Sequence, residues 1–584
     1  MKTSFSRRDF IKKSAVVAGA ASAAHLLPAA LPAAEDPNAV AAGAIPVTNA
    51  AVSVAVKLPP APTPILAPAG YGVAAGPFQP TWESLSAGYQ TPEWFRDAKL
   101  GIWAHWGPQC QPEMGDWYAQ KMYQPNNAVY KFHVEKYGHP SKFGFKDVIN
   151  EWKAERWDPE HLVGLYKRAG AKYFAAMASH HDNLDLYDSK YQPWNTVRVG
   201  PKKDIIGGWT KAARNADLRL ALTVHGDRAW SWYQDAQRAD PAGPLAGVPY
   251  DGLLSKADGK GLWWEGLDPQ DLYAQYHPLS RYGWTQSGNP PLGKEFVDKF
   301  FNRTIDLIDK YQPDLLYFDD TVLPIYPSTD IGLRIAAYFY NTNLARKGKL
   351  EAVIATKGLN ADQRRALLLD VERGVTNGGE TLPWQTDTCI GSWHYEKKKL
   401  TDHTYKTAAQ VAQMFVDIVS KNGNLQISIP LPGHGEPDAD ELKFIADFTA
   451  WMDIAGEGIY ATRPWKVYGE GPSVTAPAPR GQFGGARDVR PYTSQDFRFV
   501  QKGDTLFAFA MGWPEDGKLV VTSLAQGSPL APGAIERVQQ LGTNAAIKFT
   551  RDAAGLTLLL PEKKVGDYAY GFKIKGSGLV AKAS

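Results

Sequence analysis

Between about residue 80 and residue 460, short apolar segments alternate with segments whose apolar residues recur at helical spacing. The apolar segments are 100–107, 172–179, 218–226, 314–320, 351–356, 366–372 and 424–431. Continuous apolar strands separated by helices are typical of a parallel sheet that is covered on both faces. With about seven or eight such units, the pattern favours a closed (β/α)8-like barrel over an open doubly wound sheet. No glycine-rich phosphate loop follows the first strand, which argues against a dinucleotide-binding fold.

Two of the intervening segments show the helical pattern clearly. Segment 158–171 has apolar residues at positions 162, 165, 166 and 169 and ends near a glycine. Segment 404–424 has the same spacing, and its Asn422–Gly423 pair is a good C-terminal cap. Both segments are therefore expected to be helices that cover the sheet.

The pattern changes after about residue 460. Strongly alternating segments, with Gly, Pro and Asp between them, lie at 497–513, 518–525, 546–561 and 569–576. This alternation predicts a small antiparallel β-sandwich, preceded by a Pro/Gly-rich loop at 470–488. We expect a catalytic barrel over 79–465 and a C-terminal β-sandwich over 466–584.

The N-terminus has the composition of an export signal. Twin arginines within Ser6–Lys12 precede a short, Ala-rich apolar stretch, which resembles a twin-arginine signal peptide over residues 1–34. Residues 35–78, rich in Ala, Pro and Val, are expected to be a lead-in. The alternative is a membrane anchor, but the apolar stretch is short. We expect a periplasmic or secreted protein that does not remain inserted in a membrane.

Charge and cysteine content exclude other classes of protein. The formal net charge is +3, and the basic excess lies in the first 34 residues, so the remainder lacks the clustered cations of a nucleic-acid binder. The chain has 2 cysteines, Cys110 and Cys389, which excludes a disulfide framework.

Several predicted strands end in groups that titrate or form hydrogen bonds. Catalytic groups of β/α barrels lie at the C-terminal ends of the strands. The residues at these ends are His105, His180, His181, His225, Asp319 and Glu372. Aromatic residues lie beside them in sequence: Trp106, Trp117, Tyr118, Tyr187, Trp194, Tyr317, Trp393 and Tyr395. This combination indicates a polyol-binding site. Imidazoles hydrogen-bond hydroxyls, aromatic faces cover C–H surfaces, and a carboxylate pair can catalyse the cleavage of a bond.

Each of these features has an alternative interpretation. His105 alone could be a core histidine, and adjacent strand residues point to opposite faces, so one of His180 and His181 could be structural. The run His180-His181-Asp182 could start a metal site, although no HxH or HExxH spacing accompanies it. Asp319 and Asp320 could cap the following loop. Trp117 and Tyr118 could be packing residues.

Segments 94–123, 179–209, 311–320, 383–395, 418–436 and 455–465 together resemble, in order, the α-L-fucosidases of glycoside hydrolase family 29. The resemblance implies a retaining exo-hydrolase that removes terminal α-L-fucose from glycans or polysaccharides. It also implies a β/α barrel followed by a β-sandwich, and no metal or organic cofactor.

The resemblance also assigns residues. Asp319 matches the nucleophile, His105, His180 and His181 match fucose-hydroxyl binders, and Trp117 matches an aromatic wall. The chain departs from the family at three positions. Asp116 stands where Glu is common, His225 stands where an aromatic hydroxyl is usual, and Asp320 replaces a Gly.

The acid/base position varies within the family. We expect Glu372, an acid just upstream of segment 383–395, to fill this role. The rival carboxylates are Asp370, Glu380 and Glu351, and Arg373 could pair with Glu372 structurally. Tyr317 and Trp393 are expected to provide apolar walls around the acid. A catalytically inactive sugar-binding protein and a metal-dependent hydrolase remain the alternative functions, and linkage specificity and oligomeric state stay open.

Overall fold

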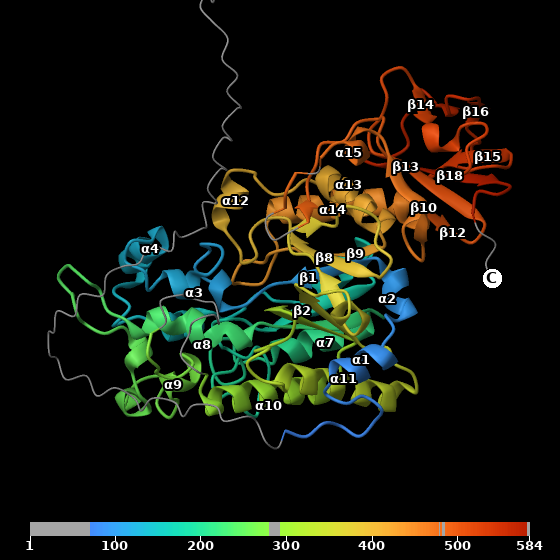
Figure 1. Ribbon diagram of the computed structural model, residues 1–584. Helices are drawn as coiled ribbons and strands as arrows, with labels where there is room; N and C mark the ends of the chain where they lie inside the picture. Colours follow the sequence, from blue (N-terminus) through green and yellow to red (C-terminus); the bar gives the residue numbers. More distant parts are fainter. Residues whose placement is uncertain (1–70, 280–291, 478, 482–484, 581–584) are drawn as a thin grey trace, which may run out of the picture. The chain divides into compact units, whose positions relative to one another are not determined.

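The computed structural model describes residues 71–279, 292–477, 479–481 and 485–580, and its centre is a closed barrel of parallel strands (Figure 1). In barrel order the strands are β1 (Leu100–Ala104), β2 (Tyr173–Ser179), β3 (Arg219–Val224), β4 (Leu315–Thr321), β5 (Val353–Lys357), β6 (Leu368–Asp370), β8 (Trp384–Cys389) and β9 (Gly423–Ser428). Pairing of β1 with β9, with Ile102 opposite Ile427, closes the barrel. The predicted barrel is confirmed, and each of the seven predicted apolar segments overlaps one of its strands.

Strand β8 has no counterpart among the predicted apolar segments. Its residues, WQTDTC, are all buried, and two of its polar side chains have partners on other strands of the barrel. Tyr317 donates a hydrogen bond to Asp387 Oδ2 at 2.8 Å, and Gln385 donates one to Asp370 Oδ1 at 2.9 Å. A strand whose polar groups are paired in the barrel interior does not need to be apolar, so hydropathy alone misses it.

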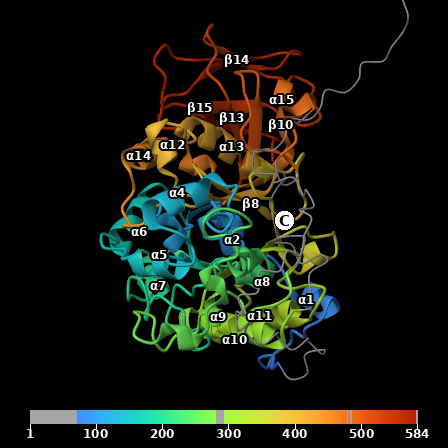
Figure 2. The same cartoon turned by 90° about the vertical axis from the view of Figure 1, so that its left-hand side faces the viewer.

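Alternation along the strands separates the barrel interior from its helical cover. Trp103, Tyr173 and Tyr317 belong to a small cluster of buried residues, whereas Ile102 and Phe174 belong to the main core of the domain. Helices α7 (Ile205–Asn215), α10 (Lys294–Tyr311) and α11 (Ile331–Lys347) lie outside the strands in both views (Figures 1 and 2). The remaining helices are α1 (Trp82–Gly88), α2 (Glu93–Ala98), α3 (Tyr118–Lys121), α4 (Ala128–Tyr137), α5 (Phe145–Glu151), α6 (Pro159–Arg168), α8 (Ala229–Trp232), α9 (Pro269–Leu272), α12 (Lys397–Thr401), α13 (Ala408–Ser420), α14 (Ala439–Ala455) and α15 (Pro472–Thr475).

Both predicted helices form, with shorter bounds. α6 begins after Asp158, whose side chain accepts the backbone N–H of His161 and caps the helix. α13 begins after Thr407, which forms a reciprocal capping box with Gln410, so residues 404–407 stay outside the helix. It ends at Ser420, and Asn422 takes the left-handed conformation with φ 73° before β9 starts.

The C-terminal region forms two antiparallel sheets, as the alternating segments predict. The larger sheet has the order β10 (Arg463–Glu470), β12 (Phe497–Lys502), β13 (Thr505–Ala510), β18 (Tyr570–Gly576) and β15 (Ile535–Gln540). The smaller sheet has the order β14 (Lys518–Val521), β17 (Leu556–Leu559) and β16 (Lys548–Arg551). Buried residues of both sheets form one hydrophobic cluster, and the short strands β7 (Gly374–Val375) and β11 (Ala486–Arg487) pair separately.

A buried ion triad joins α13 to β12. Asp417 Oδ1 lies 2.5 Å from Arg498 Nε, and Asp417 Oδ2 lies 2.7 Å from Lys421 Nζ. The three side chains are at most 1% exposed. Each charge therefore has a partner although it is removed from water.

The predicted signal peptide, residues 1–34, and most of the lead-in lie outside the described residues. Within the residues that are described, no helix combines the length and the apolar character needed to cross a bilayer.

Candidate active site

The predicted strand-end residues meet at one end of the barrel. His105, His180 and His225 directly follow β1, β2 and β3, and Asp319 lies two residues before the end of β4. The His105 ring centroid is 5.1 Å from that of His180 and 5.2 Å from that of His225. Parallel strands that close into a barrel end on the same side, so residues far apart in the sequence become neighbours.

Asp319 has partners on both carboxylate oxygens. Oδ1 lies 2.5 Å from Lys357 Nζ, and Oδ2 lies 3.2 Å from His225 Nδ1 and 3.4 Å from His181 Nε2. Burial by itself raises the pKa of the Asp319 carboxyl, but the Lys357 ammonium and the two histidines outweigh it and hold this pKa well below its usual range. The side chain is still 24% exposed, so an ionised carboxylate is accessible to a ligand.

Glu372 lies near the same ammonium. It follows β6 by two residues, and its Oε2 forms an ion pair with Lys357 Nζ. Its Oε1 accepts a hydrogen bond from the Trp393 indole at 3.1 Å. Burial raises the pKa of Glu372, and nearby Asp387 and Asp319 raise it further, against the opposing effect of Lys357. The two carboxylates at this end of the barrel therefore have pKa values shifted in opposite directions.

The rival carboxylates lie in other surroundings. Asp370 is 2% exposed and accepts a hydrogen bond from Gln385 inside the barrel. Glu351 precedes β5 and pairs with Arg219 at 2.9 Å, and Glu380 pairs with Arg364 at 2.8 Å. Of these four carboxylates, Glu372 is the one that forms an ion pair with Lys357.

Asp116 and Trp117 reach the site from the turn before α3. Asp116 Oδ1 accepts the backbone N–H of His394 at 2.8 Å, and its Oδ2 lies 3.7 Å from Arg373. Trp117 takes the left-handed conformation with φ 66°, and its ring centroid is 6.3 Å from that of Trp232. Tyr118 is buried and hydrogen-bonds His133, which is a packing role.

The two predicted aromatic walls differ in depth. Trp393 is partly exposed, and its ring centroid lies 5.3 Å from that of Trp103 and 5.6 Å from that of His105. Tyr317 is 1% exposed and uses its hydroxyl on Asp387, so it lies beneath the carboxylates inside the barrel. Trp393 thus contacts Glu372 directly, whereas Tyr317 supports the site from below.

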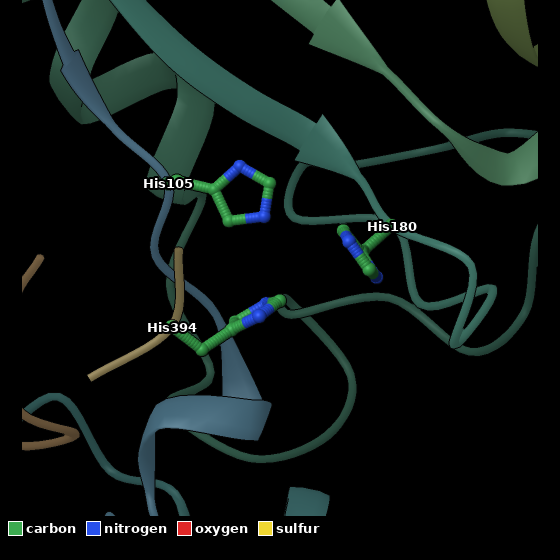
Figure 3. A group of neighbouring side chains, drawn as sticks. All are labelled: His105, His180 and His394. Atoms are coloured by element: carbon green, nitrogen blue, oxygen red, sulfur yellow. The ribbon is translucent and has the colours of Figure 1, made fainter. Parts of the chain in front are cut away.

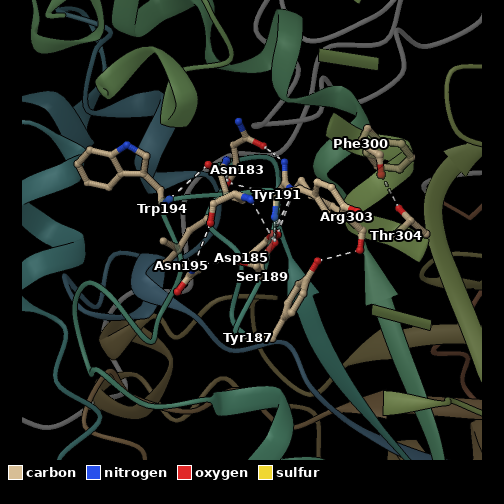
Figure 4. A network of polar contacts seen from close by, with 12 residues as sticks. Asn183, Asp185, Tyr187, Ser189, Tyr191, Trp194, Asn195, Phe300, Arg303 and Thr304 are labelled. Carbon is tan, nitrogen blue, oxygen red and sulfur yellow. Dashed lines mark hydrogen bonds and ion pairs between the residues drawn. The ribbon is translucent and has the colours of Figure 1, made fainter. Parts of the chain in front are cut away.

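The segment after the paired histidines is held by Arg303 of α10 (Figure 4). Arg303 donates to Asp185 Oδ1 at 2.6 Å and to Asn183 Oδ1 at 2.5 Å, and Tyr187 donates its hydroxyl to the Arg303 carbonyl at 2.9 Å. This buried network fixes the loop that carries His180 and His181. Asn183, Asp185 and Tyr187 therefore have a structural role.

Asp182 does not join the histidines in a metal cluster. Its Oδ2 accepts a hydrogen bond from Gln109 at 3.0 Å, and its Oδ1 accepts the backbone N–H of Leu184 at 3.2 Å. In the described part of the chain, the converging groups of potential ligands are His105–His180–His394 and His180–His181–His225, and neither contains Asp182. The geometry thus does not support the predicted alternative of a His180-His181-Asp182 site.

Sequence reasoning did not select two residues of the site, Lys357 and His394. Lys357 directly follows the predicted strand 351–356, so a search for charged residues at strand ends would have found it. His394 follows Trp393 in a connection between β8 and α12, where sequence position does not predict which strand ends it approaches.

The chain resembles known proteins over most of its length. A family model described as alpha-L-fucosidase matches residues 66–457, and a model of the alpha-L-fucosidase C-terminal domain matches residues 490–575. The plasma alpha-L-fucosidases of Pongo abelii and Homo sapiens are each 26% identical to the chain, over 83% of its length and 89% of theirs.

Solved structures show the same fold. The crystal structure of Thermotoga maritima alpha-fucosidase with a mechanism-based inhibitor is 22% identical, covers 85% of this chain and 99% of that chain, and has a TM-score of 0.63. Because the first family model spans well over half of the sequence, the chain belongs to the alpha-L-fucosidase family of glycoside hydrolases.

Proposed function

We propose that this chain is a retaining, exo-acting α-L-fucosidase with Asp319 as nucleophile and Glu372 as acid/base. The observation that carries the proposal is the contact of one ammonium, Lys357 Nζ, with both carboxylates at the barrel end. A shared ammonium keeps the nearest oxygens of the two carboxylates within about 5 Å, comparable to the ~5–5.5 Å between the carboxyl groups of retaining glycosidases. Inverting enzymes separate these groups by ~6.5–9.5 Å to admit a water molecule.

The proposed reaction has two displacements. In the first, an Asp319 oxygen attacks the anomeric carbon of terminal fucose while protonated Glu372 gives its proton to the departing glycosidic oxygen. A glycosyl ester and a free alcohol result. In the second, Glu372 carboxylate takes a proton from water, the water oxygen attacks the anomeric carbon, and the bond to Asp319 breaks. Fucose leaves with its anomeric configuration retained.

The electrostatics of the site suit this division of roles. A nucleophile must be ionised, and the pKa of Asp319 is held low by Lys357, His181 and His225 against the effect of burial. An acid must hold its proton near neutral pH, and burial raises the pKa of Glu372. Two carboxyl groups whose surroundings push their pKa values apart are typical of glycosidase acid/base pairs.

The decisive test is hydrolysis of an aryl α-L-fucoside by the wild type and by Asp319→Ala, with the anomer first released identified by NMR. We expect the variant to lose several orders of magnitude in kcat/KM, azide to restore turnover partly as a glycosyl azide, and the wild type to release the α-anomer. Asp504→Ala is the matched control, because Asp504 is exposed between β12 and β13. A near-normal rate for Asp319→Ala refutes the assignment, and sugar binding without hydrolysis by the wild type would favour an inactive binding protein.

The substrate is expected to be a fucose-containing glycan or polysaccharide. Export by the twin-arginine route, to the periplasm or the medium, is part of the proposal and is supported by the Ser6–Lys12 segment. Fractionation of cells that express the wild type or the Arg7→Lys, Arg8→Lys double variant tests it. Export should fail in the double variant, and equal export of both proteins would refute the route.

A further inference from the structure

A third imidazole, that of His394, converges on two of the predicted sugar-binding histidines (Figure 3). Its ring centroid lies 4.7 Å from that of His105 and 4.7 Å from that of His180. A ring nitrogen of each residue lies within 4.8 Å of one from each of the other two. The three residues come from the ends of β1 and β2 and from the connection after β8, so tertiary structure alone brings them together.

Two of these imidazoles lack hydrogen bonds although they are buried. His105 is 3% exposed and His394 is 0% exposed, and in the described part of the chain neither ring nitrogen of either residue has a hydrogen-bond partner. Leaving a buried polar group unsatisfied destabilises a protein, and such groups in native proteins require an explanation. Sugar hydroxyls both donate and accept hydrogen bonds, so they can pair with an imidazole nitrogen in either role.

Asp116 positions His394. Its Oδ1 accepts the His394 backbone N–H at 2.8 Å, and the same oxygen lies 3.8 Å from His394 Nδ1, beyond hydrogen-bond distance. The family resemblance leads one to expect the longer Glu at position 116. The shorter Asp116 is instead engaged with the backbone of His394, and this arrangement leaves the imidazole beside His105 and His180.

The polar contacts of His180 favour a hydroxyl over a metal ion at this cluster. Gln109 Nε2 lies 2.9 Å from His180 Nδ1 and 3.0 Å from Asp182 Oδ2. Because the Gln109 amide nitrogen can only donate, Asp182 Oδ2 and His180 Nδ1 both accept from it. Neutral His180 then carries its proton on Nε2, which suits donation to a hydroxyl oxygen and not metal ligation.

We propose that His394 is a substrate-binding residue of the fucosidase site, where it hydrogen-bonds a hydroxyl of the terminal fucose together with His105 and His180. This inference rests on the proposed function and adds to it a residue that neither the sequence interpretation nor the family resemblance assigns.

A cycle that pairs enzyme variants with deoxy substrates tests the proposal. The kcat/KM values of wild type and His394→Ala are measured on an aryl α-L-fucoside and on its 2-, 3- and 4-deoxy analogues. We expect His394→Ala to lose about tenfold or more on the parent, the size of one hydrogen bond of about 1.4 kcal/mol. Its discrimination against one deoxy analogue should shrink by a similar factor, because that analogue lacks the hydroxyl that His394 binds. His394→Gln, which keeps donors and acceptors, should recover part of this discrimination.

Two controls separate the outcomes. His403→Ala removes an exposed histidine that pairs with Asp440. It should leave the ratio of kcat/KM on the parent fucoside to kcat/KM on each deoxy analogue unchanged. Unfolding midpoints check that His394→Ala folds. The proposal is overturned if a folded His394→Ala protein discriminates against all three deoxy analogues as strongly as the wild type does. It is also overturned if calorimetry shows that the wild type binds zinc stoichiometrically and that His394→Ala abolishes this binding.

Failure of the proposed function would be recognised separately. If the wild type hydrolyses no fucoside, the catalytic assignment fails. Calorimetric binding of fucose and its deoxy analogues to Asp319→Ala, with and without His394→Ala, then still tests His394. We expect His394→Ala to reduce the difference in binding affinity between fucose and one deoxy analogue. An unchanged difference overturns the inference.

Discussion

Lys357 Nζ at the end of β5 lies 2.5 Å from Asp319 Oδ1 in β4 and forms a second ion pair with Glu372. Burial lowers the pKa of Lys357, but Asp319 and Glu372 outweigh burial and hold this pKa well above its usual value. Lys357 is therefore charged throughout the neutral range. One cation thus lowers the pKa of both proposed catalytic groups, and its removal should change the pH dependence of the enzyme.

Lys357→Met should move the whole pH profile of kcat/KM to higher pH. The acidic limb reports ionisation of Asp319, which is active only above its pKa, and loss of the nearby cation raises that pKa. The alkaline limb reports loss of the Glu372 proton, and the same substitution raises that pKa too. Initial rates on an aryl fucoside across the pH range measure both limbs. Lys357→Arg keeps the charge and should retain both limbs near their wild-type positions. If both limbs of Lys357→Met also stay at the wild-type positions, Lys357 does not lower the pKa values of Asp319 and Glu372.

Glu372→Gln should separate substrates by leaving group. An aryl fucoside with an acidic phenol needs little protonation, so its first displacement should slow much less than that of a fucoside with a poor leaving group. Single-turnover rates on both substrates give the comparison. Asp370→Asn is the matched variant, because Asp370 lies in the barrel interior, and it should not change the ratio of the two rates. If Glu372→Gln slows both substrates by the same factor, Glu372 is not the acid.

Prolonged dialysis against a chelator should leave kcat/KM unchanged. The proposed double displacement uses Asp319 and Glu372, and Asp182 is engaged with Gln109 and Leu184 instead of completing a metal cluster. Activity before and after dialysis, and after zinc is returned, checks the expectation. Loss of activity that zinc restores would revive a metal-dependent mechanism.

Asp417→Asn should destabilise the protein. The variant leaves Arg498 and Lys421 buried without their anionic partner, and breaking a buried ion pair costs about 3–5 kcal/mol. Urea unfolding followed by fluorescence should show a lower midpoint. Asp504→Asn, at an exposed pair with Lys575, should leave the midpoint unchanged.

The effect of Asp417→Asn should also depend on pH. Burial raises the pKa of Asp417, but Lys421 and Arg498 outweigh it and depress this pKa. A depressed carboxyl pKa stabilises the fold above the unfolded-state value, and this stability is lost as pH falls through the folded-state value. The difference between wild type and variant should therefore be full near neutral pH and shrink in strong acid. A difference that is constant across this range would contradict the ionic role of Asp417.

The alternation of apolar strands and amphipathic helices was sufficient to predict the barrel, and alternating segments were sufficient for the C-terminal sheets. The predicted strand ends also placed His105, His180, His225 and Asp319 together, because every parallel strand of a barrel ends on the same side. These features depend on local periodicity and on one topological rule, so they can be read from the chain.

Tertiary structure alone decided the rest. Strand β8 is polar because Asp387 and Gln385 find their partners on other strands. Lys357 acquires its importance from two carboxylates, one 38 residues before it and one 15 residues after it. His394 meets His105 and His180 only when the barrel closes. Hydrogen bonds and ion pairs act over a few ångströms in space, and sequence patterns do not encode which distant groups will come within that range.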